Sequence, residues 1–213
     1  MYSTNQTRNL FRQVEGVRPE AIFFDLGKVL LDFDWTRAIP RFACHANRDY
    51  ERVKQFIAAP LHIEFELGMV TPPDFYRAGV DAMGFRGSFD EFKSIWCEIF
   101  SEIFPLIDVA KRLALEYPLY LISNTNVLHV EYVERQYDVF SIFEQRFYSC
   151  QMKLRKPDPR VFEIALSASK CERRQALLVD DRIENVESAR ACGLQTLHVT
   201  SPDAAANELR HLL

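Results

Sequence analysis

AIFFDLGKVL, residues 21–30, places one carboxylate directly after a short apolar run. The four residues before Asp25 lack polar alternation, which is typical of a strand buried on both faces, as in a parallel sheet covered by helices. No helical pattern follows Asp25, so a helix N-cap does not explain this carboxylate. The stretch therefore predicts a buried strand that ends in a functional carboxylate, with Gly27 two residues further on.

Further short apolar runs repeat this pattern along the chain, at residues 118–123, 146–149, 176–179 and 196–199. Helical patterns lie between them, at residues 108–116, 158–169 and 184–192. The second helical pattern begins with a capping Asp158 and Pro159, and the third stops at Gly193. This alternation predicts an α/β fold, a Rossmann-like doubly wound parallel sheet with right-handed crossovers.

Residues 34–104 break the alternation, because they contain helical patterns and no convincing strand. Thr71 precedes two prolines, and Ser88 precedes Glu91 by three residues, so both resemble helix starts and the second fits a capping box. The dense aromatic residues of this segment suit the core of a small helical bundle. We predict an inserted helical cap domain at 34–104, a Rossmann-like core at 19–33 and 105–213, and a polar N-terminal tail at 1–18.

The composition excludes several classes of protein. The 213 residues are 48% hydrophobic and 26% charged, which is typical of a globular chain. The net charge of -4 and the pI near 5.8 argue against a general nucleic-acid partner. Five widely spaced cysteines without a C-x-x-C pair indicate reduced thiols. With no apolar run of membrane-span length, we expect a cytoplasmic protein without a membrane partner.

Polar side chains gather where the predicted strands end, and ligands of open α/β sheets bind at these carboxyl ends. The side chains are Asp25, Ser123, Asn124, Lys156, Asp180 and Asp181. Carboxylates this close repel one another unless a cation lies among them. Because hard oxygen ligands suit Mg²⁺, the pattern predicts a site for Mg²⁺ and a phosphate group.

These side chains lie in four segments, which read DLGKVLLDFD, LISNTNVLH, LRKPDPRVFE and DDRIENVESARACGL, with the helical cap inserted between the first two. In this order, the segments resemble motifs I to IV of the haloacid dehalogenase superfamily of phosphohydrolases. Within the superfamily they look most like the α-D-glucose-1-phosphate phosphatase group and the phosphatase domain of soluble epoxide hydrolases. The resemblance implies a Mg²⁺-dependent phosphomonoesterase. Its substrate would be a small phosphorylated metabolite such as glucose 1-phosphate, cleaved through an aspartyl-phosphate intermediate.

The resemblance also implies roles for the catalytic and substrate-binding residues. Asp25 would be the nucleophile that attacks phosphorus. Ser123 and the backbone N–H of Asn124 would hold phosphoryl oxygens at the start of a helix, where unpaired donors favour an anion. Lys156 would neutralise charge on the transferring group and restrain Asp25. Arg155 is expected at the surface or facing the substrate.

The metal ligands follow from the same resemblance. Asp181 would bind Mg²⁺ directly and Asp180 directly or through water, together with Asp25 and the backbone carbonyl of Gly27. A metal held there offsets the repulsion between an attacking carboxylate and an anionic phosphate. Asn185, in the first turn of the next helix, is expected to orient Asp181.

Gly27 departs from most phosphatases of the superfamily, which carry a second Asp two residues after the nucleophile as the general acid. Such an acid typically contributes about 10²–10⁴-fold. The α-D-glucose-1-phosphate phosphatase group also has D-L-G, so the glycine does not by itself abolish activity. One explanation is a substrate that has a good leaving group or supplies its own proton, and another is a carboxyl group elsewhere in the chain. Asp32 and Asp34 are candidates for that carboxyl group, although surface charges at the cap hinge are the favoured reading.

Two alternatives remain. A haloacid dehalogenase proper also lacks the second Asp, but it has no paired aspartates such as Asp180 and Asp181. A non-catalytic relative that binds a phosphorylated ligand or a protein partner would gain nothing from retaining Asp25 and Lys156. His129, on the helix after Ser123, is expected to be solvent-exposed rather than part of the site.

Overall fold

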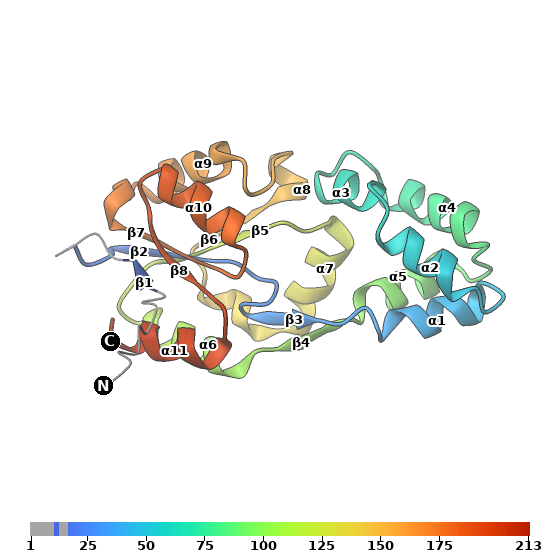
Figure 1. Ribbon diagram of the computed structural model, residues 1–213, viewed down its shortest axis with the longest axis horizontal. Helices are drawn as coiled ribbons and strands as arrows, with labels where there is room; N and C mark the ends of the chain where they lie inside the picture. Colours follow the sequence, from blue (N-terminus) through green and yellow to red (C-terminus); the bar gives the residue numbers. More distant parts are fainter. Residues whose placement is uncertain (1–10, 13–16) are drawn as a thin grey trace, which may run out of the picture.

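A computed structural model describes residues 11–12 and 17–213, and a six-stranded sheet lies at its centre (Figure 1). The strand order is β1-β8-β7-β2-β5-β6. The strands are β1 Phe11–Arg12, β2 Ala21–Phe24, β5 Leu119–Ser123, β6 Gln145–Tyr148, β7 Ala176–Asp180 and β8 Gln195–His198. All neighbours pair in parallel except β1, which runs antiparallel to β8. The predicted α/β fold is confirmed, and each predicted strand end lies within one residue of the observed one.

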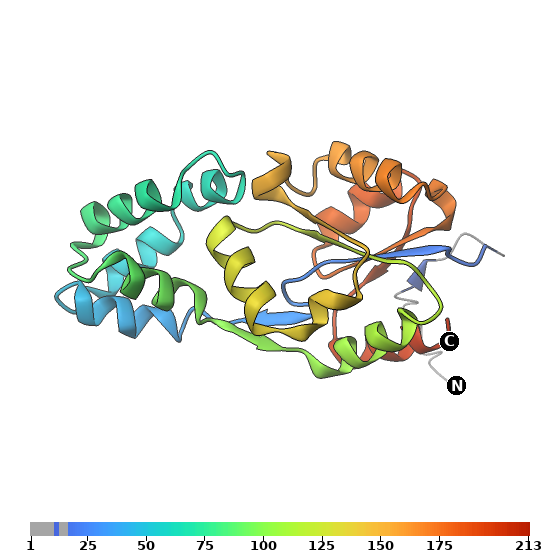
Figure 2. The same cartoon turned by 180° about the vertical axis from the view of Figure 1, so that it is seen from behind.

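Helices cover both faces of this sheet (Figures 1 and 2). They are α6 Phe104–Leu113, α7 Val127–Gln136, α8 Ser149–Met152, α9 Pro159–Ser169, α10 Ile183–Ala191 and α11 Pro202–Arg210, with 3-10 turns at Asp138–Ile142 and Arg173–Gln175. Ile22 and Phe24 pack with α6, α7 and α11, whereas Ala21 and Phe23 pack with α9 and α10. The strand that leads to Asp25 is therefore buried on both faces.

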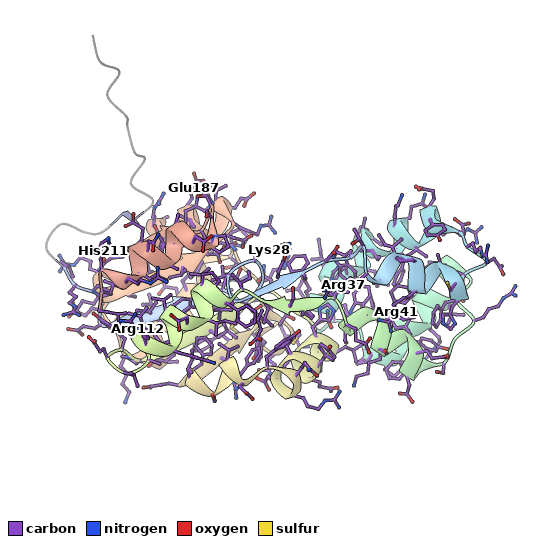
Figure 3. The ribbon with its side chains drawn as sticks, turned by 90° about the horizontal axis from the view of Figure 1, so that it is seen from below. Lys28, Arg37, Arg41, Arg112, Glu187 and His211 are labelled. Carbon is purple, nitrogen blue, oxygen red and sulfur yellow. The ribbon has the colours of Figure 1, made fainter. Side chains whose placement is uncertain are left out.

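A separate group of helices forms the other end of the molecule (Figures 1 and 2). They are α1 Ala38–His45, α2 Tyr50–Ile57, α3 Leu61–Glu66, α4 Pro72–Met83 and α5 Phe89–Cys97. Phe42, Phe75, Phe92 and Trp96 form their aromatic core. The predicted helix starts are confirmed, because the Thr71 side chain caps α4 and Ser88 forms a capping box with α5. In Figure 3, Arg41 marks this end and His211 the opposite one.

The prediction that residues 34–104 contain no strand is wrong. β3 (Leu31–Phe33) and β4 (Phe100–Glu102) form a two-stranded antiparallel sheet where the chain enters and leaves the helical group (Figure 1). Each strand has three residues, which is too short for a readable alternation. Because each is a strand only through pairing with the other, local sequence does not show it.

The sequence also made predictions about the helix at 108–116, the N-terminal tail and membrane-spanning segments. The helix predicted at 108–116 is α6, which begins at Phe104 because Pro105 occupies its first turn. Residues 1–10 and 13–16 of the predicted N-terminal tail lie outside the described residues, whereas residues 11–12 belong to the sheet as β1. Among the described helices, none has the length and apolar character needed to cross a membrane.

Candidate active site

Asp25 follows β2 at the carboxyl edge of the sheet and is 8% exposed. Its backbone N–H donates to Val179 O at 2.9 Å, which continues the pairing with β7. Its Oδ1 accepts from the Leu26 N–H at 2.7 Å and lies 2.9 Å from Lys156 Nζ. Within the described chain no donor hydrogen-bonds to Oδ2. One oxygen is thus fixed, and the other is left for chemistry.

Lys156 lies between two carboxylates and is only 1% exposed. Its Nζ is 2.9 Å from Asp25 Oδ1 and 2.6 Å from Asp180 Oδ2. Burial opposes its charge, but Asp180 and Asp25 together raise the pKa of Lys156 above its ordinary value. The Asn124 side chain holds the Lys156 backbone, accepting from its N–H at 2.8 Å and donating to its carbonyl at 2.8 Å. Lys156 is therefore fixed at its backbone by Asn124 and at its ammonium by Asp25 and Asp180.

Asp180 ends β7 and is fully buried. Besides Lys156, its carboxylate accepts from the Arg182 N–H at 2.9 Å and from Asn185 Nδ2 at 2.9 and 3.1 Å. The expectation that Asn185 orients Asp181 is wrong, because its amide is bound to Asp180. Since α10 begins at Ile183, Asn185 lies in the first turn and reaches back to the strand end. Asp180 is held by the protein on every side.

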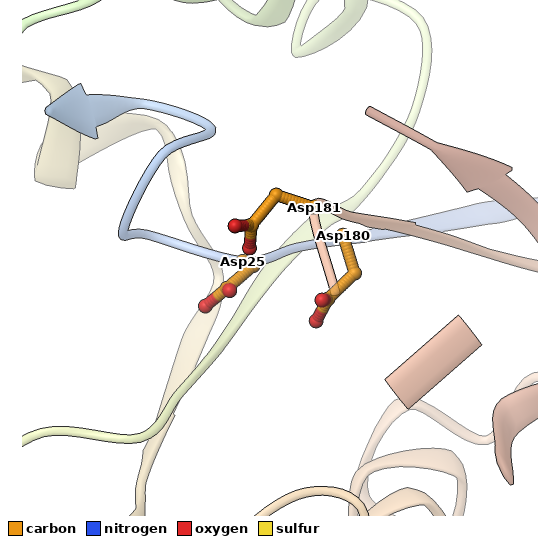
Figure 4. Close-up of side chains that lie close together, drawn as sticks. All are labelled: Asp25, Asp180 and Asp181. Carbon is orange, nitrogen blue, oxygen red and sulfur yellow. The ribbon is translucent and has the colours of Figure 1, made fainter. Parts of the chain in front are cut away.

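Asp25, Asp180 and Asp181 form one acidic cluster, with an oxygen of each within 4.8 Å of the others. Figure 4 shows the Asp181 carboxylate turned toward Asp25. Burial raises the pKa of Asp25, with Lys156 opposing and Asp180 and Asp181 adding to the rise. Burial and Asp180 raise the pKa of Asp181 as well. Three carboxylates gathered beside a single ammonium form a donor set that fits a divalent cation.

A cavity of about 170 Å³ opens above Asp25 between the sheet edge and the helical group. Its lining brings together the predicted residues Asp25, Gly27, Ser123, Asn124, Lys156 and Asp181. Asp180 lies below them and reaches the site through Lys156. Phe33, Trp35 and Phe100 form an aromatic wall, and His62, Glu66 and Arg155 form a polar one.

Phe33 fills the space beside Gly27. A Cβ atom built on Gly27 would lie 3.1 Å from Phe33 Cε1. Lys28 supports this ring, with Nζ 4.7 Å from its centroid and 3.1 Å from the Phe33 carbonyl oxygen. Asp32 pairs with Lys28, and Asp34 binds Thr36. Neither aspartate lines the cavity, so the geometry disfavours both as a replacement acid.

Sequence reasoning missed His62 and Glu66 of the polar wall, whereas Arg155 was expected at the surface or facing the substrate. His129, expected at the surface, is buried against Trp96, with ring centroids 5.6 Å apart. Arg155 makes an ion pair with Glu66 at 2.9 Å. His62 and Glu66 are four residues apart and so share one face of α3. That spacing was visible in the sequence, but nothing local placed α3 against the loop that carries Arg155.

Comparisons with known proteins agree with this geometry. A D-ribitol-5-phosphate phosphatase of Bacteroides thetaiotaomicron is 25% identical over 183 residues, 82% of this chain and 89% of the relative. A sesquiterpene phosphatase of Aspergillus oryzae is 25% identical over 198 residues, 91% of this chain and 96% of the relative. A HAD family enzyme of Bacteroides thetaiotaomicron, solved with magnesium and inorganic phosphate, has a TM-score of 0.74 and 25% identity over 86% of this chain and 94% of its own.

The family comparison covers most of the chain. The model of the haloacid dehalogenase-like hydrolases matches residues 19–193, which span all four motifs and the inserted helices. The resemblance of the motifs is thereby confirmed. The chain therefore belongs to the haloacid dehalogenase-like hydrolase family.

Proposed function

We propose that this hydrolase removes the phosphate group from a small phosphorylated metabolite in the presence of Mg²⁺. The observation that carries the proposal is the arrangement around Asp25: one oxygen is fixed by Leu26 and Lys156, and the cavity above is lined by the clustered carboxylates of Asp25 and Asp181. An acidic floor repels a phosphate unless a cation is bound there. It therefore suits a reaction in which metal and phosphate enter together.

The chain's own residues would act as follows. Asp25 Oδ2 attacks phosphorus, and the P–O bond to the leaving group breaks, giving an aspartyl-phosphate. Lys156 holds Asp25 in place and offsets charge on the phosphoryl oxygens. Ser123 and the Asn124 N–H, which line the cavity just before α7, are positioned to bind those oxygens.

Asp25, Asp181 and the Gly27 carbonyl are the proposed direct ligands of Mg²⁺, with Asp180 as the supporting carboxylate. When bound, the ion would withdraw charge from the phosphoryl oxygens. Asp181 makes no ion pair with any described residue, which leaves its carboxylate for the metal. Asp180 is already bound by Lys156 and Asn185, which favours an indirect role.

The cavity supports a polar leaving group of modest size. Its volume of about 170 Å³ is below the range of about 300–1,000 Å³ for drug-sized ligands. Arg155 lines the cavity and uses Nη2 for its ion pair with Glu66, and a guanidinium has five N–H donors, so others are left for a substrate hydroxyl. One similar relative is named for ribitol 5-phosphate. We propose a sugar or polyol phosphate as the substrate, with glucose 1-phosphate among the candidates.

We also propose that residues 34–104 act as the cap over a core of residues 19–33 and 105–213. Two contacts support a closed arrangement: Arg155 pairs with Glu66 of α3, and His129 Nε2 lies 3.0 Å from the Trp96 carbonyl oxygen of α5. A closed cap excludes water from the leaving group and shapes the space that it occupies.

The test is phosphate release from a panel of phosphomonoesters, including glucose 1-phosphate and ribitol 5-phosphate, with Mg²⁺ or with EDTA. We expect metal-dependent turnover that is lost in Asp25→Asn. A folded protein that binds Mg²⁺ but turns over no ester would contradict the proposal and favour a phospho-ligand binder. Halide release from a 2-haloacid without metal would instead favour a dehalogenase, which the three clustered carboxylates argue against.

A further inference from the structure

Gly27 leaves the proposed reaction without an obvious proton donor for the leaving oxygen, so the cavity wall must supply one or the substrate must do without. Besides the proposed metal ligands, the ionisable side chains that line the cavity are Lys28, His62, Glu66, His129, Arg155, Lys156 and Arg182. Arginine does not release its proton in proteins. Lys156 is held between Asp25 and Asp180. Four candidates are left.

Contacts within the protein exclude three of these four side chains as proton donors: Lys28 and Glu66, and then His129. Lys28 Nζ is bound to Asp32 and to the Phe33 carbonyl oxygen. Glu66 is paired with the Arg155 guanidinium at 2.9 Å, so its carboxylate is an acceptor rather than a donor.

His129 uses both ring nitrogens inside the protein. Nε2 lies 3.0 Å from the Trp96 carbonyl oxygen, so it carries the proton and donates it there, while Nδ1 lies 3.1 Å from Asn126 Nδ2 and accepts. Burial lowers the pKa of His129 to about 3, so the ring stays neutral. His129 therefore fixes α7 against α5 and has no proton to give.

His62 is the candidate that remains. It lies on α3, lines the cavity and keeps 21% of its side chain exposed. The rings of Trp35 and Trp96 hold it edge-on, with centroids 5.8 and 5.1 Å away. Its Nε2 is 3.7 Å from Glu66 Oε1, which is within ion-pair range but too long for a hydrogen bond. The imidazole thus has Glu66 and the Ile57 backbone as polar neighbours, and no hydrogen bond to a described side chain holds it.

We infer that His62, carried by the cap rather than by the nucleophile loop, is the proton donor to the leaving oxygen. This inference rests on the proposed function. When Asp25 attacks phosphorus and the P–O bond breaks, the imidazolium proton moves to the departing oxygen and an alcohol leaves. Water then attacks the aspartyl-phosphate, neutral His62 takes its proton, and phosphate leaves Asp25. One water is consumed and His62 ends protonated, as it began.

The groups around His62 shift its pKa in opposite directions. Burial lowers its pKa, and Arg155 lowers it further, whereas Glu66 and the Ile57 backbone favour the protonated ring. His129 is the other titratable group nearby, and its ring stays neutral. A phosphate dianion entering the cavity adds a negative charge, which favours the protonated ring at the moment when the donor is needed.

The experiment compares wild type with His62→Gln on an alkyl phosphate and on 4-nitrophenyl phosphate, in single turnover with Mg²⁺. 4-Nitrophenolate leaves without a proton, so its release should stay near the wild-type rate in the variant. Alcohol release should fall by about 10²–10⁴-fold. The wild-type kcat/KM for the alkyl ester should also fall as pH rises through the His62 pKa, a limb that the variant lacks.

His45→Gln serves as the matched control, because this second cap histidine contacts Phe85 and does not line the cavity. Nitrophenolate release also reports that the variant is folded. Equal losses on both esters, or no loss on either, would overturn the role of His62. If wild type releases neither product while Asp25→Asn behaves identically, the proposed function itself fails, which is a separate result.

Discussion

Gly27 and Phe33 compete for one space on the cavity wall. A Cβ at position 27 would lie 3.1 Å from Phe33 Cε1, so the ring must move by a few tenths of an ångström to admit a new side chain. Overpacking of this kind costs about 1–3 kcal/mol, and each kcal/mol lowers Tm by roughly 2–4 °C in a chain of this size. We therefore expect Gly27→Asp to melt earlier and to gain no activity on alkyl phosphates, measured by thermal unfolding and phosphate release.

Two variants separate steric from chemical effects at this position. Gly27→Ala adds the same Cβ without a carboxylate and should lose similar stability. Gly27→Asp combined with Phe33→Leu should recover it. Unchanged stability together with faster turnover in Gly27→Asp would show that the ring yields and that the acid was simply missing.

Lys156 is the second residue whose environment allows a quantitative expectation. Its ammonium lies within 2.9 Å of Asp25 and 2.6 Å of Asp180, and Lys156→Met would leave two buried carboxylates facing each other. Removing one partner of a buried pair costs about 3–5 kcal/mol. Urea unfolding at neutral pH without metal should show that loss. Lys153→Met, on the same loop but exposed, should show much less, and equal losses would contradict the assignment.

Among the elements, those defined by local sequence were predicted well. The strands of the main sheet are apolar runs buried on both faces, so composition and length identify them. β3 and β4 were not predicted, because Leu31 and Glu102 become neighbours only after the cap has folded between them. The contribution of α3 to the site was not predicted for the same reason. Its Glu66 meets Arg155 across 89 residues, a pairing that no local pattern encodes.

The contact between α5 and α7 makes an element-scale prediction about pH. His129 has a folded-state pKa of about 3, below its ordinary value of 6.5. The unfolded chain therefore binds a proton first, and this contribution is present above pH 6.5 and lost as pH falls toward 3, by up to about 1.4 kcal/mol per pH unit. Urea unfolding between pH 7 and 4 should show a shallower decline for His129→Gln than for wild type.

Carboxylates also titrate in this pH range, so the role of His129 is tested by the difference in pH dependence between the variant and wild type. His211→Gln, an exposed histidine at the C-terminal end, should follow the wild-type curve. If the His129→Gln curve also runs parallel to wild type, the α5–α7 contact does not depend on a neutral ring.

For the whole molecule, the predictable half of the site is the half made by topology. Asp25, Ser123 and Asp181 meet because parallel strands bring their carboxyl ends to one edge. The upper half, with Trp35 and His62, depends on how the cap packs onto that edge. Its residues were visible in the sequence, but their direction toward the cavity was not.

Mg²⁺ and phosphate should bind cooperatively in this cavity. The acidic cluster gathers three carboxylates beside one ammonium, so Mg²⁺ should stabilise the folded chain, by about 2.7 kcal/mol at a hundredfold excess over its Kd. Inorganic phosphate added with Mg²⁺ should raise Tm further than the sum of the separate effects, because each reduces the repulsion that the other meets. Phosphate alone should do little, since Asp25 and Asp181 repel it.

Asp181→Asn should abolish the Mg²⁺ shift, because Asp181 is the cluster member that lacks an ammonium, guanidinium or amide partner among the described side chains. Asp32→Asn, whose carboxylate pairs with Lys28 outside the cavity, should retain it. A Mg²⁺ shift that survives in Asp181→Asn would move the metal away from the nucleophile. Loss in both variants would point to a general charge effect. Only the selective loss ties the metal, the phosphate and Asp25 to one edge of the sheet.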